Sequence, residues 1–379
     1  MKKAVIAGYV RSPFTPASKG ALREVRPDEL AAQVVKGLIA RTGIDPADIE
    51  DLILGCAFPE GEQGLNIARL VVLLAGLPQS VAGVTVNRFC GSSMQAIHMA
   101  AGAIAMNAGE AFICAGVESM SRVPMQGFNP MPHPGLTERY PQAYISMGET
   151  AENVAAKHKI AREQQEAFAI TSQQRAAAAR SAGRFEAEIV AIEHNGATVN
   201  ADGCIRPDTS AQGLAALKPA FDAKGSVTAG TSSPLTDGAA AVLVCSEDYA
   251  RSTGIKPLAG IRSSAVAGCA PELMGIGPVP ASRKALQRAG VSIADMDVAE
   301  VNEAFASQAL AVLHDLALDP AKVNLDGGAI ALGHPLGASG ARITGKAASL
   351  LAREHGKLAL ATQCIGGGQG IATVLEAVA

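Results

Sequence analysis

The sequence predicts an α/β fold in which helices cover both faces of a largely parallel β-sheet. Two patterns indicate this fold: short apolar, β-branched runs alternate with segments whose apolar residues recur every three or four positions, and the alternation occurs on both sides of a Pro-rich stretch. Strands alternating with helices are typical of parallel sheets with helices on both faces. The 379 residues, 48% of them hydrophobic, allow about two to three domains and a large core.

In the first half of the chain, helix signals mark the connections between short apolar strands. Pro27 with two acidic residues after it, and Gly43 beyond the last apolar position, predict a helix between them. Residues 66–77 are apolar nearly all round, which predicts a buried helix, and a further helix follows Cys90. The expected strands of this half are 4–7, 52–56, 81–86 and 111–115, and we expect the strand at 81–86 to be buried.

The middle of the chain interrupts this alternation. Residues 119–144 contain several prolines and two glycines, and long irregular stretches inside compact proteins are usually functional or interfacial. Helices are predicted at 149–158 and 162–182, followed by loops and short strands over 186–227. We therefore expect residues 119–235 to form an inserted loop domain that covers the sheet.

After this insertion the strand–helix alternation resumes. Helices are predicted at 280–289, after 302–305 and at 339–353, and the expected strands are 239–244, 257–267, 298–301, 322–325, 358–362 and 371–375.

The predicted elements divide the chain into two similar halves. Residues 1–118, completed by about 236–255, form an N-terminal half, and residues 256–379 form a C-terminal half. Val86-Asn87 and Val323-Asn324 each precede a turn containing glycine and then an Ala-rich helix, which is a weak internal repeat. Two such halves would place two helix N-termini near one another.

Composition and charge exclude several classes of function. The net charge of −3 and the absence of a basic run argue against nucleic-acid binding. No stretch is apolar for long enough to span a membrane, and the N-terminal apolar run is too short for a signal peptide, so a cytoplasmic protein is expected. The seven cysteines include no CxxC pair, which argues against a disulfide framework and a zinc site; no metal is expected.

Cys90 lies where a predicted strand turns into a predicted helix, at or just before the helix N-terminus. Free N–H groups and the partial positive charge of a helix N-terminus stabilise a thiolate, the reactive form of cysteine. The small residues Gly91, Ser92 and Ser93 leave room for a substrate carbonyl. A buried structural cysteine is the competing interpretation, and this local context leaves both open.

Three further turns carry polar groups at the predicted ends of strands, where α/β sheets bind ligands. They are 302–305, 327–337 with His334, and 364–370 with Cys364 and four glycines. A dinucleotide-binding fingerprint fits the last turn badly, because a strand rather than a helix follows it. A cysteine and a histidine together can form a nucleophile with its base.

Four of these stretches resemble the active-site motifs of the thiolase family, in the same order and at similar spacing. They are Asn87-Arg88-Phe89-Cys90-Gly91-Ser92-Ser93, Asn302-Glu303-Ala304-Phe305, Gly333-His334-Pro335 and Cys364-Ile365-Gly366-Gly367-Gly368-Gln369-Gly370. The resemblance continues at 64–69, 228–233 and 274–280 and runs nearly end to end. It implies a thiolase fold: two βαβαβαββ halves packed in layers, with an inserted loop domain.

The resemblance also implies a role for each catalytic residue. Cys90 would be the acylated nucleophile, His334 its activating base, and Cys364 the acid/base for the acetyl α-carbon and the CoA thiol. Asn302 would hold a water that completes one oxyanion hole, and the N–H groups of Cys90 and Gly366 would form the other. The related ketoacyl synthases carry His in place of the second cysteine, so Cys364 favours a thiolase.

Coenzyme A is implied as a substrate, with no permanently bound cofactor. Ser233 matches the position near the pantetheine, and Arg206 the position near the adenine-ribose phosphate. Met147, Met274 and Phe305 match residues that line the acyl pocket, although plain core packing would also explain them.

The implied reaction is CoA-dependent cleavage of 3-ketoacyl-CoA to acetyl-CoA and a shortened acyl-CoA, as in fatty-acid β-oxidation. Acetoacetyl-CoA thiolase, which condenses two acetyl-CoA, is the alternative; Ser146, where such enzymes commonly have His, favours the degradative type. Pro234 departs from the Gly or Ala of many members. A silent CoA-binding paralogue and a ketoacyl synthase are the rival classes. The family resemblance implies a homodimer or homotetramer, with the Pro-rich stretch as a further contact or a docking site for a β-oxidation hydratase/dehydrogenase subunit.

Overall fold

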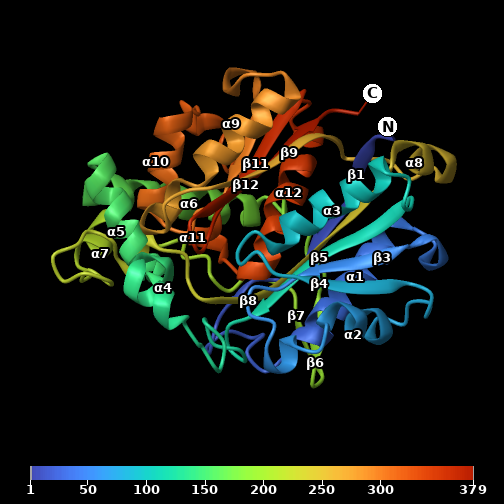
Figure 1. The fold of residues 1–379 in the computed structure, drawn as a ribbon, viewed down its shortest axis with the longest axis horizontal. Helices are drawn as coiled ribbons and strands as arrows, with labels where there is room; N and C mark the ends of the chain where they lie inside the picture. The colour runs from blue at the N-terminus through green and yellow to red at the C-terminus, as the bar shows by residue number, and fades with distance from the viewer. Residues whose placement is uncertain (1, 379) are drawn as a thin grey trace.

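The computed structural model describes residues 2–378, and its core is one large mixed sheet (Figure 1). The strands follow the order β10-β11-β12-β9-β1-β8-β5-β3-β4, with β2 paired to β8. The two halves of the chain meet at the centre, where β1 pairs with β9 over only two residue pairs, Val5–Gly260 and Ile6–Ala259. The sheet is therefore two half-sheets joined by a short seam.

The N-terminal half follows the predicted order of strands and helices. Its elements are β1 (Ala4–Arg11), β2 (Thr15–Pro16), α1 (Pro27–Thr42), β3 (Asp51–Gly55), α2 (Ile67–Leu74), β4 (Ala82–Val86), α3 (Ser92–Ala105), β5 (Ala111–Ser119), β8 (Thr236–Ser246) and α8 (Glu247–Thr253). Gly43 ends α1 in the left-handed conformation (φ 68°), as its position predicted.

Two predictions of burial in this half are wrong. The segment 81–86 forms β4, which is the last strand at one edge of the sheet and is only partly buried. The helix α2 packs beside β4 and exposes 50% of Leu73 and 39% of Leu74, with Leu65 before it 88% exposed. One face of α2 therefore belongs to the core, with Ile67, Ala68, Val71 and Val72 buried, while the apolar residues of its other face are exposed at the edge of the sheet.

The C-terminal half repeats the same arrangement. Its elements are β9 (Ala259–Gly268), α9 (Pro278–Ala289), β10 (Val298–Val301), α10 (Ala306–Leu316), α11 (Ala329–Leu332), α12 (Leu336–Arg353), β11 (Leu358–Ile365) and β12 (Gln369–Glu376).

The strand predicted at 322–325 is wrong. Only Val323 bridges β10, at Ala299, and Asn324 then turns away with a positive φ of 48°. The Asn324 amide donates to the carbonyl of Val301 and its oxygen accepts from the Val301 N–H, so a side chain replaces the missing backbone pairs. This segment occupies the place that β4 has in the other half, as the internal repeat predicted.

The largely parallel sheet was also a wrong prediction. The pairs β3·β4, β3·β5 and β10·β11 are parallel, because the chain between the two strands of each pair crosses back through at least one helix. The other pairs are antiparallel: β11 and β12 form a hairpin, and β8, which enters after the insertion, runs against both β5 and β1.

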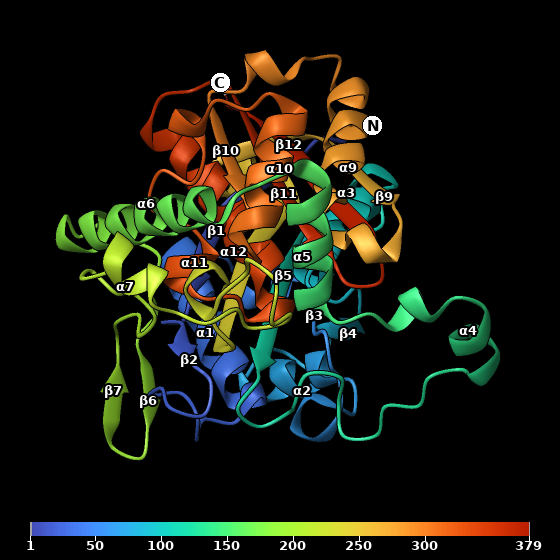
Figure 2. The same cartoon turned by 90° about the vertical axis from the view of Figure 1, so that its left-hand side faces the viewer.

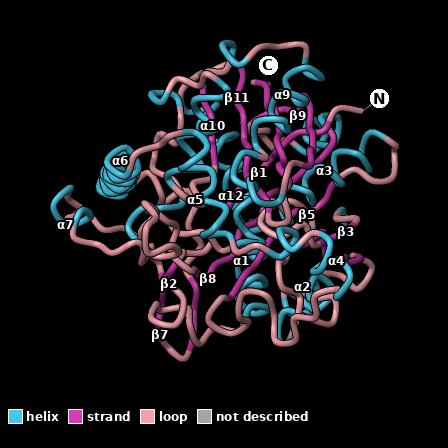
Figure 3. The backbone as a smooth tube through the Cα atoms, turned by 60° about the vertical axis from the view of Figure 1, so that its left-hand side comes forward, coloured by secondary structure: helices cyan, strands magenta, loops and turns pink. Residues whose placement is uncertain are grey.

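Helices and half-sheets pack in layers, and three apolar clusters fill the spaces between them. One cluster lies between α1, α2 and the N-terminal half-sheet, and another lies between α9, α10 and the C-terminal half-sheet. The third surrounds α3 and α12, which pack against each other between the two half-sheets. Figure 3 shows α12 in the interior of the molecule, and nearly all of its residues are buried.

Residues 119–235 lie across one side of this core. Their elements are α4 (Pro134–Arg139), α5 (Met147–His158), α6 (Arg162–Ser181), β6 (Ile192–His194), β7 (Ala197–Val199) and α7 (Ala211–Ala215). Figure 2 shows α4 on an arm that projects from the body, whereas α5 and α6 lie against it. The division into an inserted domain and two halves stays a prediction. No helix within residues 2–378 combines the length and apolarity that crossing a membrane requires.

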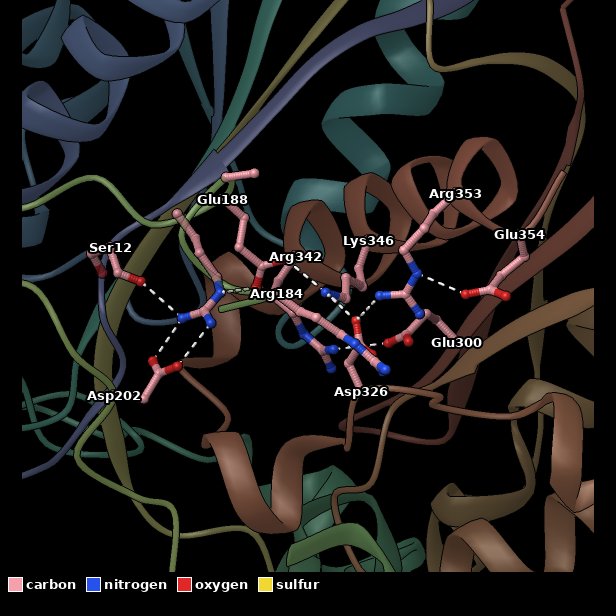
Figure 4. A network of polar contacts seen from close by, with 12 residues as sticks. Ser12, Arg184, Glu188, Asp202, Glu300, Asp326, Arg342, Lys346, Arg353 and Glu354 are labelled. Carbon is pink, nitrogen blue, oxygen red and sulfur yellow. Dashed lines mark hydrogen bonds and ion pairs between the residues drawn. The ribbon is translucent and has the colours of Figure 1, made fainter. Parts of the chain in front are cut away.

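A buried ion network ties residues 119–235 to the core (Figure 4). Arg11 of β1 binds Asp202 at 2.6 Å and Glu188 at 2.7 Å, and both carboxylates lie within residues 119–235. Lys346 of α12 binds Glu188 and Asp326, each at 2.8 Å, while Arg342 one turn earlier binds Glu300 of β10 at 2.8 Å. Breaking one of these buried pairs would leave an uncompensated charge, so losing either partner would be destabilising.

Candidate active site

Cys90 sits on a tight turn between the edge strand β4 and α3. Phe89 before it has a positive φ of 43°, a strained conformation for an aromatic residue. Side chains hold the turn: the Asn87 carboxamide oxygen accepts from the Phe89 N–H at 2.8 Å, and the Ser92 hydroxyl accepts from the Arg88 N–H at 2.8 Å. The position at the corner before α3 is the one that the sequence predicted.

The environment of Cys90 changes the expectation for its protonation. The pKa of the Cys90 thiol is raised to about 12: burial is the largest cause, the nearby Glu118 carboxylate also raises the pKa, and hydrogen bonds from the N–H groups of Gly366 and Cys90 lower it. Burial therefore opposes the stabilisation of the thiolate that the sequence predicted from the helix N-terminus, and the net shift favours the thiol. Cys90 is a neutral thiol at pH 7 and needs a base.

His334 lies in the turn between α11 and α12, and its backbone N–H donates to the Thr236 hydroxyl at 3.0 Å. Its Nδ1 lies 2.5 Å from the Ser339 hydroxyl, and its Nε2 lies 3.4 Å from the Asn302 amide nitrogen. Burial, followed by the positive charge of Arg342, lowers the pKa of the imidazole to about 3. The ring is neutral at physiological pH, as a proton acceptor has to be.

Asn302 follows the last residue of β10 and is fully buried. Its backbone N–H donates to the Thr362 carbonyl of β11 at 3.0 Å, which anchors the residue at the carboxyl end of two parallel strands. Its side-chain oxygen has no hydrogen-bond partner among the described residues. A buried amide with a free polar atom beside a histidine fits a site for a bound water.

Cys364 lies near the end of β11, close to Cys90. Burial raises the pKa of Cys364 well above its ordinary value, and the neighbouring Cys90 raises it further. Cys364 belongs to an apolar cluster with residues from four other parts of the chain: Ala151, Val227, Met274, Ala304 and Phe305, with Met147 packed against them. The structure thus gathers the three predicted pocket residues, Met147, Met274 and Phe305, around the second thiol.

The turn 364–370 has no room for larger residues where it meets the 274–280 stretch. A Cβ on Gly370 would lie 1.9 Å from the Gly277 carbonyl oxygen, so the two backbones touch. Arg88 joins this turn to the Cys90 turn by donating to the Gln369 side chain at 2.9 Å, and the Gln363 amide donates to the Cys90 carbonyl. These contacts hold the Gly366 N–H toward the Cys90 sulfur.

The two predicted coenzyme A residues differ in their placement. The N–H and hydroxyl of Ser233 both donate to the Ala304 carbonyl, at 3.0 and 3.1 Å, so Ser233 lies beside the 302–305 motif. Arg206 lies on the surface, and its backbone N–H donates to Gln173 of α6 at 2.7 Å. The structure brings Ser233 to the apolar cluster but leaves the Arg206 side chain exposed, away from the thiols.

Comparison with known sequence families gives two matches that together span nearly the whole chain. The family model "Thiolase, N-terminal domain" matches residues 4–248, and "Thiolase, C-terminal domain" matches residues 255–377.

The chain belongs to the thiolase family.

Individual thiolases resemble this chain along its full length. The chain is 53% identical over 388 aligned residues to "3-ketoacyl-CoA thiolase" from Shewanella sp. (strain MR-7), covering 100% of both chains. The crystal structure of the Bacillus anthracis acetyl-CoA acetyltransferase superposes with a TM-score of 0.92 at 40% identity, covering 100% of this chain and 99% of that one. The crystal structure of human mitochondrial 3-ketoacyl-CoA thiolase in complex with CoA superposes with a TM-score of 0.91 at 40% identity, covering 100% of this chain and 98% of that one.

Two residues of the thiolase site were missed by the sequence analysis. Glu118 near the end of β5 is buried and accepts four N–H groups, from Ala57, Phe58, Gln63 and Gly337, at 2.8 to 3.2 Å. It joins the loop after β3 to the first turn of α12; an acid within the apolar run 111–119 was the available signal. Ser339 touches His334, and only its place one turn after that histidine could have indicated it.

The site holds groups of the kind that acyl transfer uses. It offers a neutral thiol with an N–H donor at its sulfur, a neutral imidazole, a second buried thiol and an adjoining apolar cluster. Among residues 2–378, no group of three or more His, Cys, Asp or Glu side chains is placed to hold a metal ion. The thiolase family is a family of acyltransferases, and these groups suit that chemistry.

Proposed function

We propose that this thiolase cleaves 3-ketoacyl-CoA with CoA, releasing acetyl-CoA and an acyl-CoA shortened by two carbons. The observation that carries the proposal is the identity of 53% to "3-ketoacyl-CoA thiolase" from Shewanella sp. (strain MR-7) over 100% of both chains. The gathering of Cys90, Cys364 and an apolar cluster supports it, because the reaction needs a nucleophile, an acid/base and a place for an acyl chain.

In the first half-reaction, His334 takes the proton of Cys90 as the sulfur attacks the 3-keto carbon. The C2–C3 bond breaks, the acyl group stays on Cys90 as a thioester, and the electron pair moves to the acetyl-CoA enolate. Cys364 then donates its proton to C2. The proximity of Cys364 to Cys90 and the neutrality of both thiols support this order, since only a protonated Cys364 can act as an acid.

In the second half-reaction, CoA gives its thiol proton to the Cys364 thiolate and attacks the acyl-Cys90 carbonyl. The Cys90 sulfur leaves and recovers its proton from His334. We assign the N–H groups of Cys90 and Gly366 to the oxygen of the acyl group, and His334 with a water on Asn302 to the thioester oxygen of the enolate. The Gly366 bond to the Cys90 sulfur and the free oxygen of Asn302 support these roles.

Coenzyme A is proposed as a substrate that leaves after each turnover. We place its pantetheine near Ser233 and its phosphate-bearing end toward Arg206, whose exposed guanidinium suits a phosphate. Met147, Met274 and Phe305 would line the acyl chain. Ser146, used above as a subtype marker, caps α5 through a reciprocal bond pair with Glu149, so its neighbour Met147 rather than Ser146 adjoins the pocket.

Incubation with acetoacetyl-CoA and CoA tests the enzyme, with loss of the 3-ketoacyl-CoA absorbance as the readout. No CoA-dependent loss would favour a silent CoA-binding paralogue, and decarboxylation of malonyl groups would indicate a ketoacyl synthase. Mass spectrometry after acetyl-CoA treatment should find the acyl group on the Cys90 peptide. An acyl group found only on the Cys364 peptide would reverse the two roles.

We propose a homo-oligomer in the cytoplasm, with β4 as the interface of a dimer. The outer edge of β4 pairs with no strand within residues 2–378, and Leu65, Leu73 and Leu74 expose apolar surface beside it. The arm that carries α4 exposes Met125, Phe128 and Met131 and would serve a tetramer contact or a β-oxidation hydratase/dehydrogenase subunit.

A further inference from the structure

Ser339 is placed to control the protonation of the catalytic histidine. It is 2% exposed and lies in the first turn of α12. Its hydroxyl oxygen is 2.5 Å from His334 Nδ1 and 3.1 Å from the Pro335 carbonyl oxygen. The ring nitrogen on the far side, Nε2, faces the amide of Asn302 at 3.4 Å. Every polar atom of the imidazole therefore has one protein neighbour.

The donors and acceptors around the ring favour one nitrogen as the protonated one. A serine hydroxyl has one hydrogen to give, and a carbonyl oxygen can only accept. Helical serines commonly give that hydrogen to the carbonyl four residues earlier, which is Pro335 here. The hydroxyl oxygen must then accept from Nδ1–H, and the Nε2 lone pair is left for the Asn302 N–H. Both contacts of the ring are satisfied at once.

We propose that Ser339 is a positioning residue that holds His334 as the Nδ1–H tautomer, with the unprotonated Nε2 directed toward Asn302 and the substrate site. This inference rests on the proposed function, because Nε2 then serves as the acceptor of the Cys90 proton. In the opposite tautomer, Ser339 would donate to Nδ1, and the Asn302 side chain would be flipped so that its oxygen accepts from Nε2–H. Nε2 would then have no lone pair with which to accept the Cys90 proton.

A serine suits this position for an electrostatic reason. A carboxylate partner would add negative charge and stabilise the imidazolium, as in a catalytic triad. The hydroxyl orients the ring without charging its surroundings, while burial and Arg342 keep the ring neutral until substrate is bound. The cation then forms only during the transfer, and its Nε2–H becomes a strong donor to a developing oxyanion.

The test measures the tautomer directly in the full-length protein labelled with ¹⁵N-histidine. The His334 signals are assigned by their loss in His334→Asn. We expect Nδ1 with a protonated shift and Nε2 with an unprotonated shift. The reverse pattern in the folded wild-type protein overturns the proposal, whatever the activity.

The variant Ser339→Ala should then lose the single tautomer and lower kcat by about tenfold to a hundredfold, with KM for CoA unchanged. Thr344→Val is the matched control, because the Thr344 hydroxyl donates to the Gly340 carbonyl of the same helix and to no other group within residues 2–378; its spectrum and kcat should match the wild type. A fall in kcat for Ser339→Ala with the tautomer unchanged would show a purely structural role and overturn the proposal. An inactive wild type with the Nδ1–H signal would refute the proposed function alone.

Discussion

Replacing Glu300 by Gln should remove a large part of the pH dependence of stability between pH 5 and pH 8. Glu300 is fully buried between β10 and α12, and one of its oxygens binds Arg342 at 2.8 Å while the other has no partner among the described residues. Burial raises the pKa of this carboxyl from 4.5 to about 7, although Arg342 and Lys346 pull it down. The desolvation cost of the charge is thus larger than the attraction of its partners.

The direction of the effect follows from the two pKa values. Below pH 4.5 the carboxyl is protonated in both the folded and unfolded chain, so it contributes no pH dependence. Between 4.5 and 7 the unfolded chain ionises first, and the free energy of unfolding falls as pH rises. Above 7 the loss is complete, at about 3 kcal/mol for a shift of this size.

Urea unfolding followed by circular dichroism at pH 5 and pH 8 measures this loss. We expect the wild type to lose about 2 to 3 kcal/mol more than Glu300→Gln over that interval. The variant also loses the pair with Arg342, but this loss shifts its free energy of unfolding equally at both pH values and leaves the difference between them unchanged. Glu354→Gln is the control, because Glu354 is 43% exposed at the edge of the same network. Parallel pH curves for wild type and Glu300→Gln would refute the reasoning.

Three further predictions concern activity and assembly. Cys364→Ala should still be acylated on Cys90 by acetyl-CoA but should lose turnover by about 100- to 10,000-fold, because only the acid/base is removed; normal turnover with an acylated Cys90 would show that another group moves the proton. When kcat/KM is measured for the four-, eight- and twelve-carbon 3-ketoacyl-CoA esters, the value for a medium-chain ester should exceed that for acetoacetyl-CoA, by about threefold to fourfold for each methylene group that is buried. A strong preference for the four-carbon ester would indicate an acetoacetyl-CoA thiolase. Light scattering should find at least a dimer at micromolar concentration, and a monomeric wild type would contradict this prediction. Leu73→Glu should weaken the dimer because Leu73 is half exposed beside β4, whereas the control Glu247→Gln on α8 should leave the dimer unchanged.

Local patterns in the sequence predicted most of the elements of this protein. The helix α1 between Pro27 and Gly43, the order of strands and helices, and the turn of Cys90 before α3 all follow from residues close to one another in the chain. The predicted sheet topology failed where pairing partners are distant. The antiparallel position of β8 depends on how the chain returns after residue 235, and no local pattern records that path.

The candidate site divides in the same way. The motifs around Cys90, Asn302, His334 and Cys364 were recognisable, because small residues and glycines mark turns where backbones approach each other. The protonation of Cys90 could not be predicted, since the helix end is a local feature but burial and Glu118 come from the fold.

By itself the sequence predicted which residues would carry the chemistry, and it determined which of them lie in turns at the ends of strands. Only the tertiary structure decided their electrostatic state and their partners. It buried the Cys364 thiol and the imidazole, placed Ser339 on the far side of the ring, and set Glu300 against Arg342. The physical reason is that desolvation and hydrogen-bond partners depend on every element packed around a group, and those elements lie far apart in the chain.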